Sequence, residues 1–80
     1  MDRYPEAIAA ALRGEAAARK VSYRDLADRT GIPLRTLSRY MTGERAITVE
    51  NFMQIADALE ASATDLISDV VRRAGTPTPI

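Results

Sequence analysis

Residues 22–43 constrain the fold of this chain more than any other stretch, and their sequence is SYRDLADRTGIPLRTLSRYMTG. Ser22 and Asp25 have the spacing of a capping box, in which a hydroxyl accepts a hydrogen bond from the backbone amide three residues on. Gly31 tolerates the positive φ that a tight turn between helices needs. Pro33 suits the start of a second helix, because an amide hydrogen is not needed there. The stretch therefore predicts two short helices joined by a tight turn.

The second of these helices is expected to have two unlike faces. Tyr40 is assigned to the core with its hydroxyl reaching the surface, since a buried tyrosine usually finds a partner for that group. Apolar residues recur at helical spacing and predict the buried side, namely Ile32, Leu37 and Tyr40 or Met41. The residues left on the other side are mostly basic or hydroxylic: Leu34, Arg35, Ser38, Arg39 and Thr42.

A helix is predicted before this pair and two more after it. The first runs from about Pro5 to Arg19, and its interior Gly14 costs roughly 1 kcal/mol relative to alanine. Its apolar stripe contains Ile8, Ala11, Leu12 and Ala16. Thr48 is a candidate N-cap for the fourth helix, in which Phe52 is read as a core anchor. The apolar residues of that helix are Val49, Phe52, Ile55, Ala56 and Leu59.

The fifth predicted helix begins where Ser62 and Asp65 repeat the capping spacing, and it ends at about Ala74 with Gly75 as its stop signal. Its apolar residues are Leu66, Ile67, Val70 and Val71. This set is wider than one stripe, so Val71, together with Ile67, is expected to be exposed unless a partner covers it.

The five elements together resemble the helix-turn-helix family of the Cro and lambda-repressor type (XRE-like). Ala27 and Gly31 match the fifth and ninth motif positions, and Ile32 and Leu37 match the tenth and fifteenth. The similarity covers about residues 4 to 74, including TLSRYMTGERAITVENFMQIADALEASATDLI. The resemblance implies an all-α, compact five-helix DNA-binding domain over residues 1–75, with the helix-turn-helix at helices 2 and 3. Threonine alternates with proline over residues 76–80, which predicts a flexible tail.

The chain departs from the family at two positions where glycine is usual. Lys20 precedes the second helix, and Glu60 follows the fourth. Glu60 must either adopt the left-handed conformation at some cost or end its helix in another way.

Carried over position by position, the resemblance implies which residues meet DNA. The residues expected to face base edges in the major groove are Leu34, Arg35, Ser38 and Arg39. Tyr23 and Thr42 match positions that contact phosphates in this family. Ser22, Arg24, Thr36 and Arg45 are further candidates for contacts to the DNA backbone. For Arg39 the alternative is a salt bridge across the fold.

Composition excludes several classes of function. The chain has neither cysteine nor histidine, so disulfides, the usual zinc ligands and the commonest general base are missing. Asp25 and Asp65 are explained as caps, and no nucleophile with a paired base and no glycine-rich phosphate loop appears. We expect no enzymatic activity, no cofactor, no metal and no small-molecule ligand. The chain also lacks a stretch of about 20 apolar residues, which favours a cytoplasmic protein that does not enter membranes.

The formal net charge is zero, but the charges are unevenly distributed. Residues 13–45 hold eight basic residues against four acidic ones, a net +4, whereas residues 1–12 sum to −1 and residues 46–80 to −3. Basic charge therefore gathers on the segment that contains the proposed reading helix.

The sequence predicts a sequence-specific, double-stranded-DNA-binding transcriptional regulator, repressor-like, that binds its operator as a homodimer. The contexts considered are a phage Cro-like repressor, a restriction-modification controller and an antitoxin-type autoregulator. The expected dimer interface consists of Ile67, Val70 and Val71. The alternative is a helical protein-interaction module, such as an antitoxin-type partner binder that uses the fifth helix. The surface of the third helix separates the two readings, since it offers hydrogen-bond donors and positive charge instead of apolar anchors.

Overall fold

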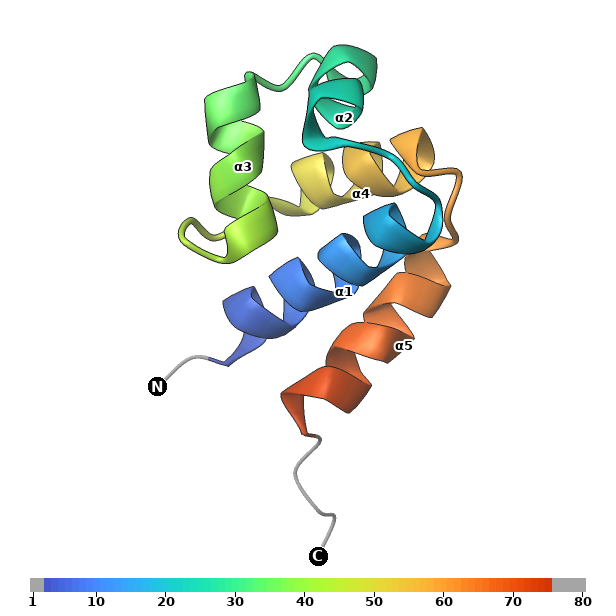
Figure 1. Ribbon diagram of the computed structural model, residues 1–80. Helices are drawn as coiled ribbons and strands as arrows, with labels where there is room; N and C mark the ends of the chain where they lie inside the picture. The colour runs from blue at the N-terminus through green and yellow to red at the C-terminus, as the bar shows by residue number, and fades with distance from the viewer. Residues whose placement is uncertain (1–2, 76–80) are drawn as a thin grey trace, which may run out of the picture.

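Five helices make up most of residues 3–75, the part of the chain that the computed structural model describes, and no strand occurs within that range (Figure 1). The helices are α1 (Tyr4–Ala18), α2 (Tyr23–Thr30), α3 (Leu34–Thr42), α4 (Val49–Ala58) and α5 (Ala63–Ala74). The all-α, five-helix prediction is confirmed. The tail predicted over residues 76–80 lies outside the described residues.

The predicted capping residues begin three of the helices. In each case a hydroxyl oxygen accepts a hydrogen bond from the backbone amide three residues on, and such a cap is worth about 1 kcal/mol. The distances are 3.1 Å for Ser22 and Asp25, 3.0 Å for Thr48 and Asn51, and 3.3 Å for Ser62 and Asp65. The starts of α2, α4 and α5 were therefore predictable from single residues.

The turn between α2 and α3 depends on Gly31, which has φ 78° and donates its amide hydrogen to the Ala27 carbonyl at 2.9 Å. Ile32 follows and is buried in the core, as predicted. Pro33 is the N-cap of α3 and does not occupy its first helical position, so α3 begins one residue later than predicted. The reason is the extended ψ of Pro33, 138°, which directs the chain from the turn into the helix.

One apolar core lies where the helices meet. Helices α1 and α5 pack side by side, α3 packs on α1 and α2, and α4 contacts both α2 and α5 (Figure 1). The core residues are Ala7, Ala11, Leu12, Ala16, Leu26, Ile32, Leu37, Tyr40, Met41, Phe52, Ile55, Ala56, Leu59, Leu66, Val70 and Ala74. No charged or polar side chain is buried among residues 3–75. The core assignments of Phe52 and Tyr40 are confirmed.

Val49 was expected to contribute to the core from the apolar face of α4. It does not, because its side chain is 79% exposed. It is the first residue of α4, where the helix extends beyond the closed core and borders a surface groove. Helical spacing identified the correct face of α4 but not how far the core continues along it.

Gly14 lies where α5 crosses α1. A Cβ atom at this position would come within 3.2 Å of the Arg73 guanidinium, so the glycine gives that side chain room to lie against α1. Arg73 and Arg72 also donate hydrogen bonds to Asp69, at 2.8 and 2.7 Å, and these bonds hold the pKa of the Asp69 carboxyl below its ordinary value. The charges in the last turn of α5 are thus largely paired with one another.

The α1–α2 and α4–α5 connections share one backbone geometry. After α1, the Val21 amide donates to the Ala16 carbonyl at 2.9 Å and the Lys20 amide donates to the Ala17 carbonyl at 3.1 Å, the two bonds of a Schellman motif. After α4, Ala61 bonds to Ala56 at 2.9 Å and Glu60 bonds to Asp57 at 3.0 Å. Lys20 has φ 59° and Glu60 has φ 56°, so both non-glycine residues adopt the left-handed conformation.

No helix within residues 3–75 has the length and apolar content needed to cross a lipid bilayer.

Replacing Glu60 by glycine is expected to raise the free energy of unfolding by about 1 kcal/mol, because glycine avoids the Cβ clash of the left-handed conformation. Urea denaturation followed by circular dichroism measures the change. Ala17→Gly is the matched control, since Ala17 is exposed within α1 and a glycine there should instead destabilise by about 1 kcal/mol. A destabilised Glu60→Gly chain would contradict the strain argument.

Candidate nucleic-acid interface

Helices α2 and α3 stand together at one end of the molecule, and α3 turns one face away from the core (Figure 1). Leu37, Tyr40 and Met41 form the buried face. Leu34, Arg35 and Thr42 are exposed, while Ser38 and Arg39 are partly exposed. The predicted division of this helix into a core face and an outer face is confirmed.

Two arginines on the outer face, Arg35 and Arg39, are one helical turn apart. Residues four apart lie on the same side of a helix, so both guanidinium groups can reach one ligand surface. The Arg35 side chain makes no hydrogen bond or ion pair with any residue in the range 3–75. A guanidinium group offers planar, paired donors that suit phosphates and base edges.

Arg39 lies near one acidic side chain, that of Glu44, in the loop after α3. The distance from Arg39 Nε to Glu44 Oε1 is 3.9 Å, and the two side chains are 42% and 68% exposed. An exposed pair at this distance is worth about 0–1 kcal/mol, so it does not hold Arg39 in place. Within residues 3–75, the alternative of a salt bridge across the fold is not observed, because the partner of Arg39, Glu44, lies two residues after the end of α3.

Not all of the basic residues between 13 and 45 are available to a ligand. Arg13 and Arg29 donate to the carbonyls of Met41 and Ala58, both at 2.9 Å, and Arg19 pairs with Glu15. The basic side chains of this segment that make no such bond within the described range, and are exposed, are Lys20, Arg24, Arg35 and Arg45. The net charge of the segment therefore overstates the positive surface that it presents.

The other residues predicted to contact the DNA backbone differ in the interactions that their side chains already make within the protein. The Ser22 oxygen accepts the capping bond of α2, which leaves its hydroxyl hydrogen available. The Thr42 hydroxyl donates to the Arg39 carbonyl at 3.2 Å. Tyr23 is partly buried and packs against the core, and Thr36 is partly exposed. Ser22 and Tyr23 lie at the start of α2, whereas Thr36 and Thr42 lie within α3.

A family model described as helix-turn-helix matches residues 7–66. The chain belongs to the helix-turn-helix family. Two known proteins resemble this member of the family. One is the cryptic phage CTXphi transcriptional repressor RstR of Vibrio cholerae serotype O1 (strain ATCC 39315 / El Tor Inaba N16961), with 46% identity over 41 residues. That match covers 51% of this chain and 37% of the repressor, so the chain matches little more than a third of that relative's length.

The second similar protein is the clp gene regulator ClgR from C. glutamicum, known from a crystal structure. It superimposes on this helix-turn-helix protein with a TM-score of 0.87 and 26% sequence identity. The superposition covers 96% of this chain and 100% of the ClgR chain. The arrangement of helices around the helix-turn-helix is therefore shared along almost the whole chain.

The position of the helix-turn-helix depends on contacts that sequence reasoning missed. The Tyr40 hydroxyl accepts a hydrogen bond from Asn51 Nδ2 at 2.8 Å, which joins α3 to α4. Arg13 joins α1 to the end of α3 through the Met41 carbonyl. These bonds connect residues far apart in the chain, and helical spacing within one element carries no information about them.

The three residues predicted for a dimer interface do not have equal exposure. Ile67 and Val71 are exposed, whereas Val70 is only 7% exposed and belongs to the core, although it also lines an apolar surface groove. Val70 points inward because it lies four residues after Leu66 on the stripe that packs against the other helices.

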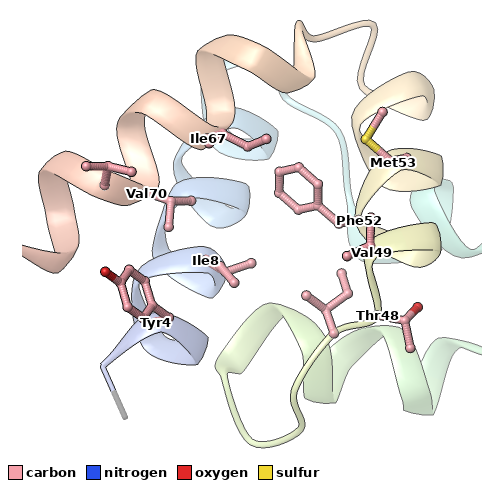
Figure 2. A pocket seen from close by; sticks show the side chains of 10 residues that line it. Tyr4, Ile8, Thr48, Val49, Phe52, Met53, Ile67 and Val70 are labelled. Carbon is pink, nitrogen blue, oxygen red and sulfur yellow. The ribbon is translucent and has the colours of Figure 1, made fainter.

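Ile67 and Val71 border an apolar groove between α1, α4 and α5 (Figure 2). Its volume is about 300 Å³, and its lining residues are Tyr4, Ile8, Ile47, Thr48, Val49, Phe52, Met53, Ile67, Val70 and Val71. The lining contains all but one of the exposed large hydrophobic residues in the described range, the other being Leu34 on α3. Sequence reasoning identified the α5 side of this groove and missed the contributions of α1 and α4.

Proposed function

We propose that this chain is a sequence-specific, double-stranded-DNA-binding transcriptional regulator of repressor type, which reads the major groove with α3. The observation that carries the proposal is the outer face of α3, where Arg35 and Arg39 stand one turn apart on a helix whose other face is buried. The names of RstR, a transcriptional repressor, and ClgR, a gene regulator, support it.

Each residue of the outer face has a chemical role in this proposal. Arg35 and Arg39 donate paired hydrogen bonds to the O6 and N7 atoms of guanine. Leu34 contacts the methyl group of thymine, and Ser38 donates to or accepts from a base edge. Tyr23 and Thr42 contact phosphates. The weaker candidates for phosphate contacts are Ser22, Arg24, Thr36 and Arg45.

A homodimer completes the proposed function. One helix with two arginines reads only a few base pairs, too few to select one site among about 10⁶ or more competing sites. A two-fold dimer would place two α3 helices about 34 Å apart and would require a palindromic operator. The groove between α1, α4 and α5 is the surface available for this contact, with Ile67 and Val71 at its α5 edge.

The same groove also supports a second candidate function. An apolar groove can receive the apolar face of another protein's helix, as in an antitoxin-type partner binder. Binding of a protein helix in this groove does not account for Arg35 and Arg39 on the outer face of α3, so we favour DNA binding. Among regulatory contexts, the similarity to RstR favours a phage repressor over a restriction-modification controller or a toxin-antitoxin autoregulator.

Selection from random duplex DNA is expected to enrich one motif with two-fold symmetry, because each α3 reads one half-site. Sequencing the bound fraction after several rounds measures this. If no motif is enriched while an affinity purification recovers a stoichiometric protein partner, the protein-interaction reading is correct.

Arg39→Ala is expected to relax the selected motif at one position and to cost roughly 1–3 kcal/mol on the best site, since base contacts carry specificity. Thr42→Ala and Arg45→Ala are the comparison variants, and they should weaken binding to all sequences similarly because phosphate contacts carry mainly affinity. Titration of cognate and scrambled duplexes by fluorescence anisotropy measures both effects. If Arg39→Ala selects the same motif as the wild type, the assignment of Arg39 to a base contact in the groove is wrong.

Val71→Glu is expected to leave the chain folded but monomeric, because an isologous contact would bury two unpaired carboxylates. Analytical ultracentrifugation measures the oligomeric state, and a palindromic duplex reports the loss of cooperative binding. Ser68→Glu is the matched control, as Ser68 is exposed on α5 and does not line the groove. A wild-type protein that stays monomeric at high concentration and occupies a single asymmetric site would refute the dimer but not DNA binding.

A further inference from the structure

One carbonyl at the C-terminal end of α3 accepts a hydrogen bond from a side chain of another helix. The last carbonyls of a helix lack partners within the helix and must find them elsewhere. The loop supplies two of them here, since the Gly43 amide donates to the Tyr40 carbonyl and the Arg45 amide donates to the Arg39 carbonyl, both at 3.2 Å. The Met41 carbonyl, one residue closer to the end of the helix, accepts its hydrogen bond from a side chain of α1.

That side chain is Arg13, whose Nη1 donates to the Met41 carbonyl at 2.9 Å across 28 positions of the chain. Its other guanidinium nitrogen, Nη2, lies 3.7 Å from Glu6 Oε1, about two helical turns earlier on α1. A positive charge at this position also interacts favourably with the negative end of the α3 dipole. Arg13 thus bonds to the backbone of α3, and the exposed Glu6 carboxylate beside it adds only a weak attraction.

Glu6 approaches the same end of α3 a second time, at Gly43. A Cβ atom built on Gly43 would lie 2.9 Å from Glu6 Oε2 and 3.5 Å from the Ala9 Cβ atom. Gly43 also has φ 81°, which favours glycine. The loop after α3 therefore lies directly against α1.

We propose that Arg13 is a positioning residue that clamps the last turn of α3 to α1 and sets its orientation for sequence-specific DNA binding; this role rests on the proposed function. Arg39 and Thr42 project from that last turn. An error in the orientation of the turn moves their side chains relative to the base edges, whereas non-specific attraction to phosphates depends little on orientation. The clamp therefore acts on specificity more than on affinity for DNA in general.

The competing role for Arg13 is a direct phosphate contact, and salt dependence separates the two. Each phosphate contact contributes about −0.9 to the slope of log K against log salt concentration. A clamp residue that does not touch DNA contributes nothing to this slope. Arg19, on the same helix and paired only with Glu15, is the matched control.

The test measures binding of Arg13→Met, Arg13→Lys and Arg19→Met to the selected operator and to a scrambled duplex across a series of salt concentrations. Arg13→Met is expected to lose roughly tenfold on the operator, equivalent to about 1.4 kcal/mol, with less than about a twofold loss on the scrambled duplex and an unchanged slope. Arg13→Lys should recover part of the loss, because an ammonium can still donate to the Met41 carbonyl. Arg19→Met should match the wild type.

Equal losses on both duplexes with a slope smaller by about 0.9 would make Arg13 a phosphate contact and overturn the proposal. Unchanged operator binding would overturn it as well.

Amide hydrogen exchange tests the clamp without DNA. In Arg13→Met the Gly43 and Arg45 amides should exchange at least about tenfold faster, while the Leu26 and Leu66 amides, at the starts of α2 and α5, keep their wild-type rates. Uniformly faster exchange would mean a general loss of stability and would overturn the positioning role. If the wild-type protein binds no sequence selectively, the proposed function fails, and the exchange rates still decide whether the clamp exists.

Discussion

The packing of α3 on an alanine-lined α1 determines the rest of the structure. Ala7, Ala9, Ala11 and Ala16 are buried on α1, and side chains of this size allow neighbouring helices to approach closely. Leu37, Tyr40 and Met41 occupy the space on one side, and α5 packs along the other. Because that face of α3 is committed to the core, its remaining face must be exposed. The surface offered to a ligand is therefore a consequence of how the inner face is buried.

Polar contacts then fix the helices more exactly than apolar packing does. Apolar burial is not directional, whereas a hydrogen bond requires one donor and one acceptor in a defined geometry. The bonds from Arg13 to Met41, from Arg29 to Ala58 and from Asn51 to Tyr40 each join two different helices at one atom pair. They connect α2 and α3 to α1 and α4. The helix-turn-helix is thereby held by bonds of defined geometry, as the proposed recognition of base edges would require.

What the sequence predicted well was local. Ser22, Thr48 and Ser62 act within three residues, and the left-handed requirement of Gly31 belongs to a single residue, so each could be recognised without knowing the fold. The exposure of Val49 was missed because helical spacing specifies a face but not the edge of the core. The partners of Arg13 and Asn51 were missed because they come from other helices. Family resemblance supplied the candidate base contacts, and no local rule would have done so.

The use of arginine within the fold also explains how a chain with no net charge can suit a polyanionic ligand. Arg13 and Arg29 bond to helix carbonyls, and Arg72 and Arg73 are paired with Asp69, so their charges serve the structure. The basic residues left exposed without such bonds, in residues 13–45, lie on or beside α2 and α3: Lys20, Arg24, Arg35 and Arg45. A small number of unpaired charges gives weak attraction to any duplex. Under the proposed function, discrimination between sequences would depend on the orientation of α3 and on a second copy of the chain more than on the total charge of the protein.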